Sequence, residues 1–88
     1  MGQARLIGNC QIGEGALVDE SAIIGHPCKA AQLNERSLAS SNGSIIGVEC
    51  IIRSNSVIYE NSVLGDNVQT ANNVIIREDV VIGDGCVF

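Results

Sequence analysis

The stretch IGVECIIRSNSVIYENSVLGDNVQTANNVIIREDVVIGDGCVF, residues 46–88, repeats with a period of six residues. One aliphatic or similarly shaped residue returns in each hexad: Ile46, Ile52, Ile58, Leu64, Thr70, Ile76, Ile82 and Phe88. A helix has a period of about 3.6 residues and an isolated strand a period of about 2, so neither explains this spacing. A chain that turns one corner every six residues does explain it, and three such hexads close one triangular coil of a parallel β-helix.

The fourth position of each hexad independently supports the same phase. It holds Asn9, Gly15, Ser21, Pro27, Glu49, Asn55, Asn61, Asn67, Asn73, Asp79 and Gly85. Asn, Asp and Gly tolerate the left-handed backbone of tight turns, so each corner is expected there. We therefore predict an all-β parallel β-helix of about four coils, in which the first position of each hexad points inward.

The repeat also predicts how the chain is organised. It runs through Leu6, Ile12, Val18 and Ile24, and is then lost until Ile46, 22 residues later, which is not a multiple of six. We predict one domain over residues 1–88, with first coils over 6–29, an external loop over 30–44 and a second run of coils over 45–88. Because Phe88 begins a new hexad without a polar closing coil, we expect an open C-terminal end, as in a fragment or a stacked assembly.

Composition excludes several partners. The chain has 88 residues and a formal net charge of −5, so it offers no basic stripe for nucleic acid. Its first residues, MGQARLIGNC, hold no long apolar run that would predict a signal peptide or a membrane span.

The four cysteines all occupy the fifth position of their hexads, which elsewhere holds small or β-branched residues. They are Cys10, Cys28, Cys50 and Cys86. We interpret them as small buried hydrophobic residues. A disulfide between Cys10 and Cys28, which are 18 residues apart, is conceivable but less favoured. One histidine among scattered cysteines makes a poor zinc set, so no metal is expected, and the compartment is predicted to be a reducing cytoplasm.

The segment IIRSNSVIYENSVLGDNVQTANNVIIRE, Ile51 to Glu78, together with the hexad pattern, resembles the hexapeptide-repeat acyltransferases. The branch it is most similar to acetylates sugar amines or hydroxyls. This resemblance implies left-handed coils and acetyl-CoA as the donor substrate. It also implies a homotrimer with sites between subunits and a small acceptor such as an amino sugar or nucleotide-sugar. The external loop would help to build the site.

The resemblance places the catalytic centre at Thr70-Ala71-Asn72-Asn73. Related enzymes have T-G-H-N at this point, with the histidine as general base, and Asn72 stands in its place. A neutral amide does not accept a proton near neutral pH, and losing a general base typically slows a reaction by about 10²–10⁴-fold. Asn72 would then orient the acceptor or stabilise an oxyanion. His26, the only histidine, is the candidate substitute base, or else a structural residue where the loop starts.

The remaining candidates surround Asn72. Arg53 and Arg77 could bind a phosphate of CoA or of a nucleotide-sugar, or could simply be solvated cations. The substrate contacts would come from Asn73, Tyr59, Glu60 and Thr70. Each has a structural alternative: a corner for Asn73, a stack against Arg77 for Tyr59, an exposed corner for Glu60, and a hydroxyl bonded to a carbonyl for Thr70.

The sequence therefore leaves two functions open. The first is an acyl-CoA-dependent acyltransferase, in which the acceptor attacks the thioester directly. The second is a catalytically inactive or truncated trimeric relative, favoured by Asn72 and by the open C-terminal end. A carbonic anhydrase of the same architecture is excluded, because its metal requires three histidines and this chain has one.

Overall fold

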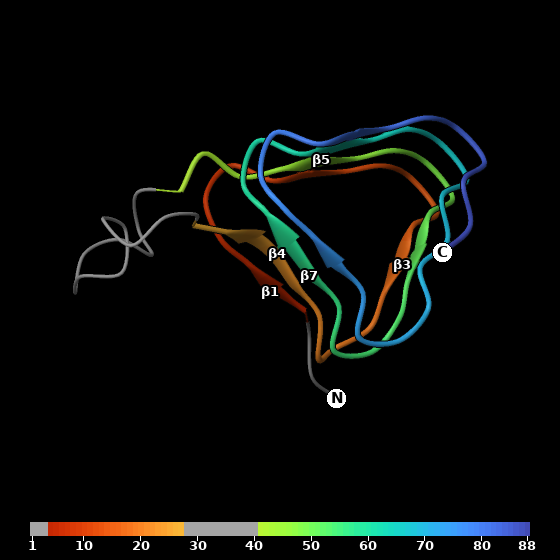
Figure 1. Cartoon of the computed structure of the whole chain (residues 1–88), viewed down its shortest axis with the longest axis horizontal. Coiled ribbons are helices and arrows are strands. Elements are labelled where there is room, and N and C mark those ends of the chain that lie inside the picture. The colour runs from red at the N-terminus through yellow and green to blue at the C-terminus, as the bar shows by residue number, and fades with distance from the viewer. Residues whose placement is uncertain (1–3, 28–40) are drawn as a thin grey trace.

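The computed structural model describes residues 4–27 and 41–88 (Figure 1). This part of the chain is all-β. Its strands are β1 (Arg5–Leu6), β2 (Gln11–Ile12), β3 (Leu17–Val18), β4 (Ile23–His26), β5 (Ile45–Ile46), β6 (Ile51–Ile52), β7 (Val57–Tyr59), β8 (Val63–Leu64), β9 (Ile75–Ile76) and β10 (Val81–Ile82). Among these residues there is no helix long and apolar enough to cross a membrane.

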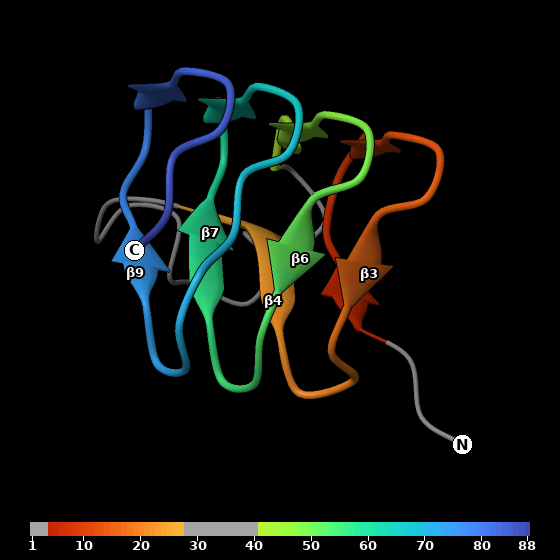
Figure 2. The ribbon, with the colours of Figure 1, turned by 90° about the vertical axis from the view of Figure 1, so that its right-hand side faces the viewer.

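The strands form three parallel sheets, and each sheet is one wall of a triangular coil (Figure 1). One wall has the order β1-β4-β7-β9, the second β2-β5-β8-β10, and the third pairs β3 with β6. Two bridges, from Ile51 to Gln69 and from Gln69 to Val87, continue the third wall. Viewed from the side, successive coils lie next to one another (Figure 2). The predicted β-helix of about four coils is confirmed.

The core is the stacked column of first-position residues inside the triangle. Ile24, Ile46, Ile52, Ile58 and Leu64 are all fully buried. Burying one such side chain stabilises the fold by about 1.5–3 kcal/mol. A solenoid of this kind needs no aromatic centre, because each coil is covered by its neighbours.

The prediction that the cysteines are small buried residues is confirmed only in part. Cys50 is buried in the core and Cys10 is half-buried, whereas Cys86 is exposed, so a buried role is wrong for Cys86. Cys10 is a free thiol whose Sγ donates to the carbonyl of Ile7 at 3.3 Å, so the structure gives no support to the less favoured disulfide. Cys28 itself lies outside the described residues.

In most coils the left-handed backbone of the corner lies at the fourth position of the hexad, as predicted. Positive φ occurs at Gly15 and at every fourth position from Glu49 to Gly85, with Asn55 at 60° and Asn73 at 63°. The corners before the interruption differ: Gly8, not Asn9, has the positive φ, and Ser21 and Pro27 have none. Gly8 is required there because a Cβ would lie 2.4 Å from the carbonyl oxygen of Ser41.

Glu60 forms hydrogen bonds on both sides of the interruption in the regular coil. Its backbone N–H donates to the carbonyl of His26, and its Oε1 accepts from the N–H of Asn42, both at 2.9 Å. Glu60 is only 4% exposed, so the expected exposed corner is wrong for this residue. Residues 28–40, which include most of the expected loop over 30–44, lie outside the described residues. A contribution of that loop to a site stays a prediction.

Candidate functional site

Five of the predicted site residues fall into two separate places. The first is a groove of about 340 Å³, hereafter the Arg53 groove. Its lining is Leu17, Val18, Asp19, Ile51, Ile52, Arg53, Ser54 and Asn72. It lies on the third wall and on the corner that follows β3 and β6. Asn72 and Arg53 therefore meet as expected, but neither His26 nor Tyr59 nor Arg77 lines this groove.

Side chains in the Arg53 groove are positioned by neighbouring coils. The Ser54 hydroxyl donates to Oδ1 of Asn72 at 3.0 Å, which leaves the amide NH₂ of Asn72 as the donor available to a ligand. The N–H of Arg53 donates to Oγ1 of Thr70 at 3.1 Å, and the Arg53 side chain is exposed. The groove therefore presents a cation next to a neutral donor.

Asn73 takes its structural alternative, and Thr70 is also structural, although its hydroxyl accepts a backbone N–H and the expected bond to a carbonyl is not what is found. Thr70 is 1% exposed in the inward column, and its hydroxyl accepts the N–H of Arg53 and lies 3.4 Å from the Ser56 hydroxyl. Asn73 forms a corner, and its N–H donates to the carbonyl of Ser54 at 2.9 Å. Neither side chain lines the Arg53 groove, so a substrate contact by either of them stays a prediction.

Asp19 brings an anion into the same groove. Its Oδ1 accepts from the N–H of Ser21 at 2.9 Å and from the Ser21 hydroxyl at 2.7 Å. These bonds, the backbone bond first, lower the pKa of the Asp19 carboxyl below its ordinary value of 3.8. Sequence reasoning missed Asp19, although an Asp followed two residues later by Ser at a corner is a typical turn pair.

The second place is a contact chain of His26, Tyr59 and Arg77 at another corner. The ring of His26 meets Tyr59 edge-on, with centroids 5.0 Å apart, and the guanidinium of Arg77 lies 4.6 Å from the Tyr59 centroid. The predicted stack of Tyr59 against Arg77 is thus confirmed. Arg77 Nε also donates to Oε1 of Glu78 at 3.0 Å, so this cation is partly compensated. A role in catalysis for His26 stays a prediction.

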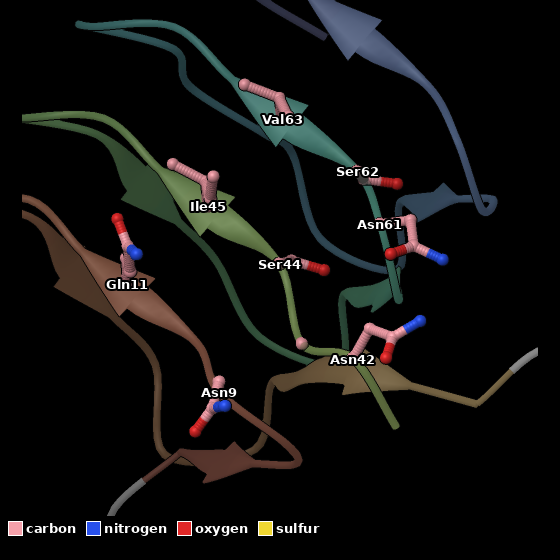
Figure 3. A pocket seen from close by; sticks show the side chains of 9 residues that line it. Asn9, Gln11, Asn42, Ser44, Ile45, Asn61, Ser62 and Val63 are labelled. Carbon is pink, nitrogen blue, oxygen red and sulfur yellow. The ribbon is translucent and has the colours of Figure 1, made fainter. Parts of the chain in front are cut away.

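A further groove of about 350 Å³, hereafter the amide groove, lies on the second wall and its leading corner (Figure 3). Sequence reasoning missed it. Its lining residues are Asn9, Gln11, Asn42, Gly43, Ser44, Ile45, Asn61, Ser62 and Val63. They come from three successive coils, and none of them is ionisable. Within residues 4–27 and 41–88, no group of three or more His, Cys, Asp or Glu is placed to hold a metal ion.

Parallel walls, triangular coils and a six-residue repeat define a β-helix domain of the hexapeptide-repeat class. The chain belongs to the family of GMPPB C-terminal domains, whose family model matches residues 1–87. That family is the left-handed β-helix C-terminal region of GDP-mannose pyrophosphorylase B and is nucleotidyltransferase-like. Neither the curated proteins nor the solved structures contain a match to the chain.

This membership corrects the functional part of the sequence analysis. Assignment to the acetyltransferases is wrong, and so are acyl transfer and acetyl-CoA as the donor. The inactive relative of those enzymes is no better supported. The physical reason is that the hexad repeat specifies coil geometry, which unrelated chemistries share. Asn72 is therefore not the position of a lost general base, and we consider it as a ligand-binding residue.

Proposed function

We propose that this chain is the ligand-binding β-helix domain of a nucleotidyltransferase-type protein and holds a nucleotide sugar in the Arg53 groove. The observation that carries the proposal is the grouping of Arg53, Asn72 and Asp19 in one groove. Family membership supports the class of ligand, since the family is nucleotidyltransferase-like. The groove volume of about 340 Å³ is at the low end of ordinary ligand sites.

Each side chain has a role suited to part of such a ligand. The guanidinium of Arg53 can bind a diphosphate through two parallel hydrogen bonds. The NH₂ of Asn72 donates, while the ionised Asp19 accepts from sugar or ribose hydroxyls. Because the Asp19 carboxylate repels phosphate, the diphosphate would lie toward Arg53 and the hydroxyl groups toward Asp19. Leu17 and Ile51 offer apolar surface for a base.

Calorimetric titration with GDP-mannose tests this proposal. We expect saturable binding, and a loss of about 10–100-fold in Arg53→Ala, because a hydrogen bond to a charged group contributes about 1.5–3 kcal/mol. Arg5→Ala is the matched control, since Arg5 is an exposed arginine outside this groove. Absence of binding, or equal loss in both variants, would contradict a site at Arg53.

We also propose that the domain assembles as a homotrimer through the outer face of the first wall. Ile23, Val57 and Ile75 lie in register on this face, and Ile75 is 63% exposed. Burying such an apolar row between subunits would be favourable. Light scattering on the intact chain should give a trimer, and Ile75→Asp should give monomers. A monomeric parent chain would contradict this assembly.

For the location of the protein we propose the cytoplasm. Cys10, Cys50 and Cys86 are free thiols in the described part of the chain. Persistent free thiols are typical of a reducing compartment. Fluorescence microscopy of the tagged protein tests this, and a secreted or periplasmic signal would contradict it.

A further inference from the structure

We propose that the amide groove is a second binding site, and that its ligand is an uncharged saccharide. This site is distinct from the Arg53 groove: the two linings share no residue. The proposal rests on the chemistry of the lining, on its arrangement over three coils and on the way it is held. It does not depend on the nucleotide-sugar proposal above.

The chemistry of the groove matches a neutral polyhydroxylated ligand. Four amide side chains line it: Asn9, Gln11, Asn42 and Asn61. In the part of the chain that the structure describes, none of these side-chain amides makes a hydrogen bond. An amide offers donors and acceptors together, as a sugar hydroxyl does, so the two can satisfy each other completely. Because no charged side chain lines the groove, it has no cation to balance the negative charge of a phosphate.

The groove also has an apolar floor. Ile45 and Val63 are adjacent on β5 and β8, and both side chains remain partly exposed, at 43% and 36%. A saccharide ring has a polar rim of hydroxyls and apolar C–H faces. A ring lying on Ile45 and Val63 would bring its rim toward the amides of Gln11 and Asn42. The groove therefore combines a small apolar floor with a largely polar rim.

Gly43 allows the two coils that carry Asn9 and Asn42 to pack closely at the corner of the groove. It occupies the corner between Asn9 and Asn61 in the stacked coils, and its φ is +79°. A Cβ here would lie 2.4 Å from the carbonyl carbon of Asn9, so the position accepts only glycine. Gly43 therefore adds no side chain to the lining, and the amides at this corner come from Asn9 and Asn61 on the neighbouring coils.

The lining is held rigidly from behind. Hydroxyls of Ser44 and Ser62 are turned inward and donate to the carbonyls of Tyr59 and Arg77, each at 2.6 Å. The N–H of Asn42 donates to the carboxylate of Glu60, and the N–H of Asn61 to the carbonyl of Gly43 at 2.7 Å. Figure 3 shows the side chains of Asn42 and Asn61 extending from the same corner on neighbouring coils. Such a fixed backbone lowers the ordering cost of binding.

The test is an amide-detected NMR titration of the intact chain with three neutral probes, methyl α-D-mannopyranoside, methyl β-D-glucopyranoside and maltotriose. We expect saturable shifts of the side-chain amides of Gln11, Asn42 and Asn61 with at least one probe. Gln11→Ala should weaken that binding by about 2–10-fold, the effect of one hydrogen bond. Gln69→Ala is the matched control, because Gln69 is an exposed glutamine on the third wall, away from the groove.

Three outcomes would overturn the proposal. These are no saturable shift with any probe, shifts that Gln11→Ala leaves unchanged, and self-association of the chain through this face. Arg53→Ala separates the two sites: it should leave saccharide binding intact while reducing the binding of GDP-mannose. If Arg53→Ala abolished the saccharide shifts as well, the sugar would be bound in the Arg53 groove and the second site would be wrong.

Discussion

The hydroxyl of Ser54 donates to Oδ1 of Asn72 across one coil, at 3.0 Å. This bond orients the amide of Asn72, which lines the Arg53 groove and can offer its NH₂ there as a hydrogen-bond donor. This orientation distinguishes it from a residue placed to accept a proton. The relationship also makes Asn72 testable without disturbing the core, since its side chain is exposed.

Replacing this donor with an acceptor should weaken nucleotide-sugar binding. Asn72→Asp would place a second carboxylate in the groove that already contains Asp19, and both would repel a diphosphate. We expect about a 10-fold higher Kd for GDP-mannose by calorimetry, which corresponds to about 1.4 kcal/mol. Asn67→Asp is the control, because Asn67 is an exposed corner residue outside both grooves. Equal affinities for Asn72→Asp and the parent chain would contradict the role of this donor.

The Asp19 carboxyl should titrate below its ordinary pKa of 3.8, because Ser21 donates two hydrogen bonds to its ionised form. A pKa that is lower in the folded than in the unfolded state stabilises the fold above the unfolded pKa. That contribution is lost as the pH falls through the folded pKa. Carboxyl-detected NMR measures the midpoint. Ser21→Ala removes the hydroxyl bond and keeps the backbone bond, so it should raise the midpoint only in part, and an unaffected midpoint would contradict the contribution of the hydroxyl.

Removing the Glu60 carboxylate should destabilise the chain although no substrate is involved. Glu60→Ala leaves the N–H of Asn42 without its acceptor in a part-buried contact, which costs about 1 kcal/mol. Chemical denaturation measures the loss in the free energy of unfolding. Glu14→Ala, at an exposed corner, should change it by less than about 0.5 kcal/mol. A neutral effect of Glu60→Ala would mean that water replaces the carboxylate.

Glu49 is the corner residue least suited to its backbone. Its φ is 60°, in the region where most non-glycine residues are strained and Asn is tolerated. Glu49→Asn should therefore raise the free energy of unfolding by about 0.5–1 kcal/mol. Asn55→Glu, the reverse change at a corner with the same φ, should lower it by a similar amount. Thermal unfolding of both variants would show opposite shifts if backbone strain is the cause.

The sequence predicts the coil well because two columns carry separate physical information. First-position residues such as Ile46 and Ile58 are buried by stacking, and fourth-position residues such as Asn61 provide the left-handed corner. Both depend on spacing along one chain, so one sequence reveals them. Gly8 shows where this fails: its conformation is required by the approach of Ser41, a contact between distant residues.

The candidate sites could be predicted only where they follow this spacing. Ser54 stacks on Asn72, 18 residues later, and Arg53 is the neighbour of Ser54, so Arg53 and Asn72 meet in one groove. The amide groove joins Asn9, Asn42 and Asn61, and its register depends on how the chain returns after the interruption. Spacing in the sequence does not give that register. Nor do the hexads distinguish an acyltransferase from a nucleotidyltransferase-like domain, because both need the same inward column.

Glu60 has a consequence for how the chain can change its length. It fixes the carbonyl of His26 and the N–H of Asn42 to one residue of the next coil. Any flexible segment long enough to join these two points closes the same gap. Loop-closure entropy grows slowly, by about 0.6 kcal/mol for each doubling of loop length. The domain can therefore gain or lose sequence between these anchors at little energetic cost, and a foreign peptide could be carried there without altering the coils on either side.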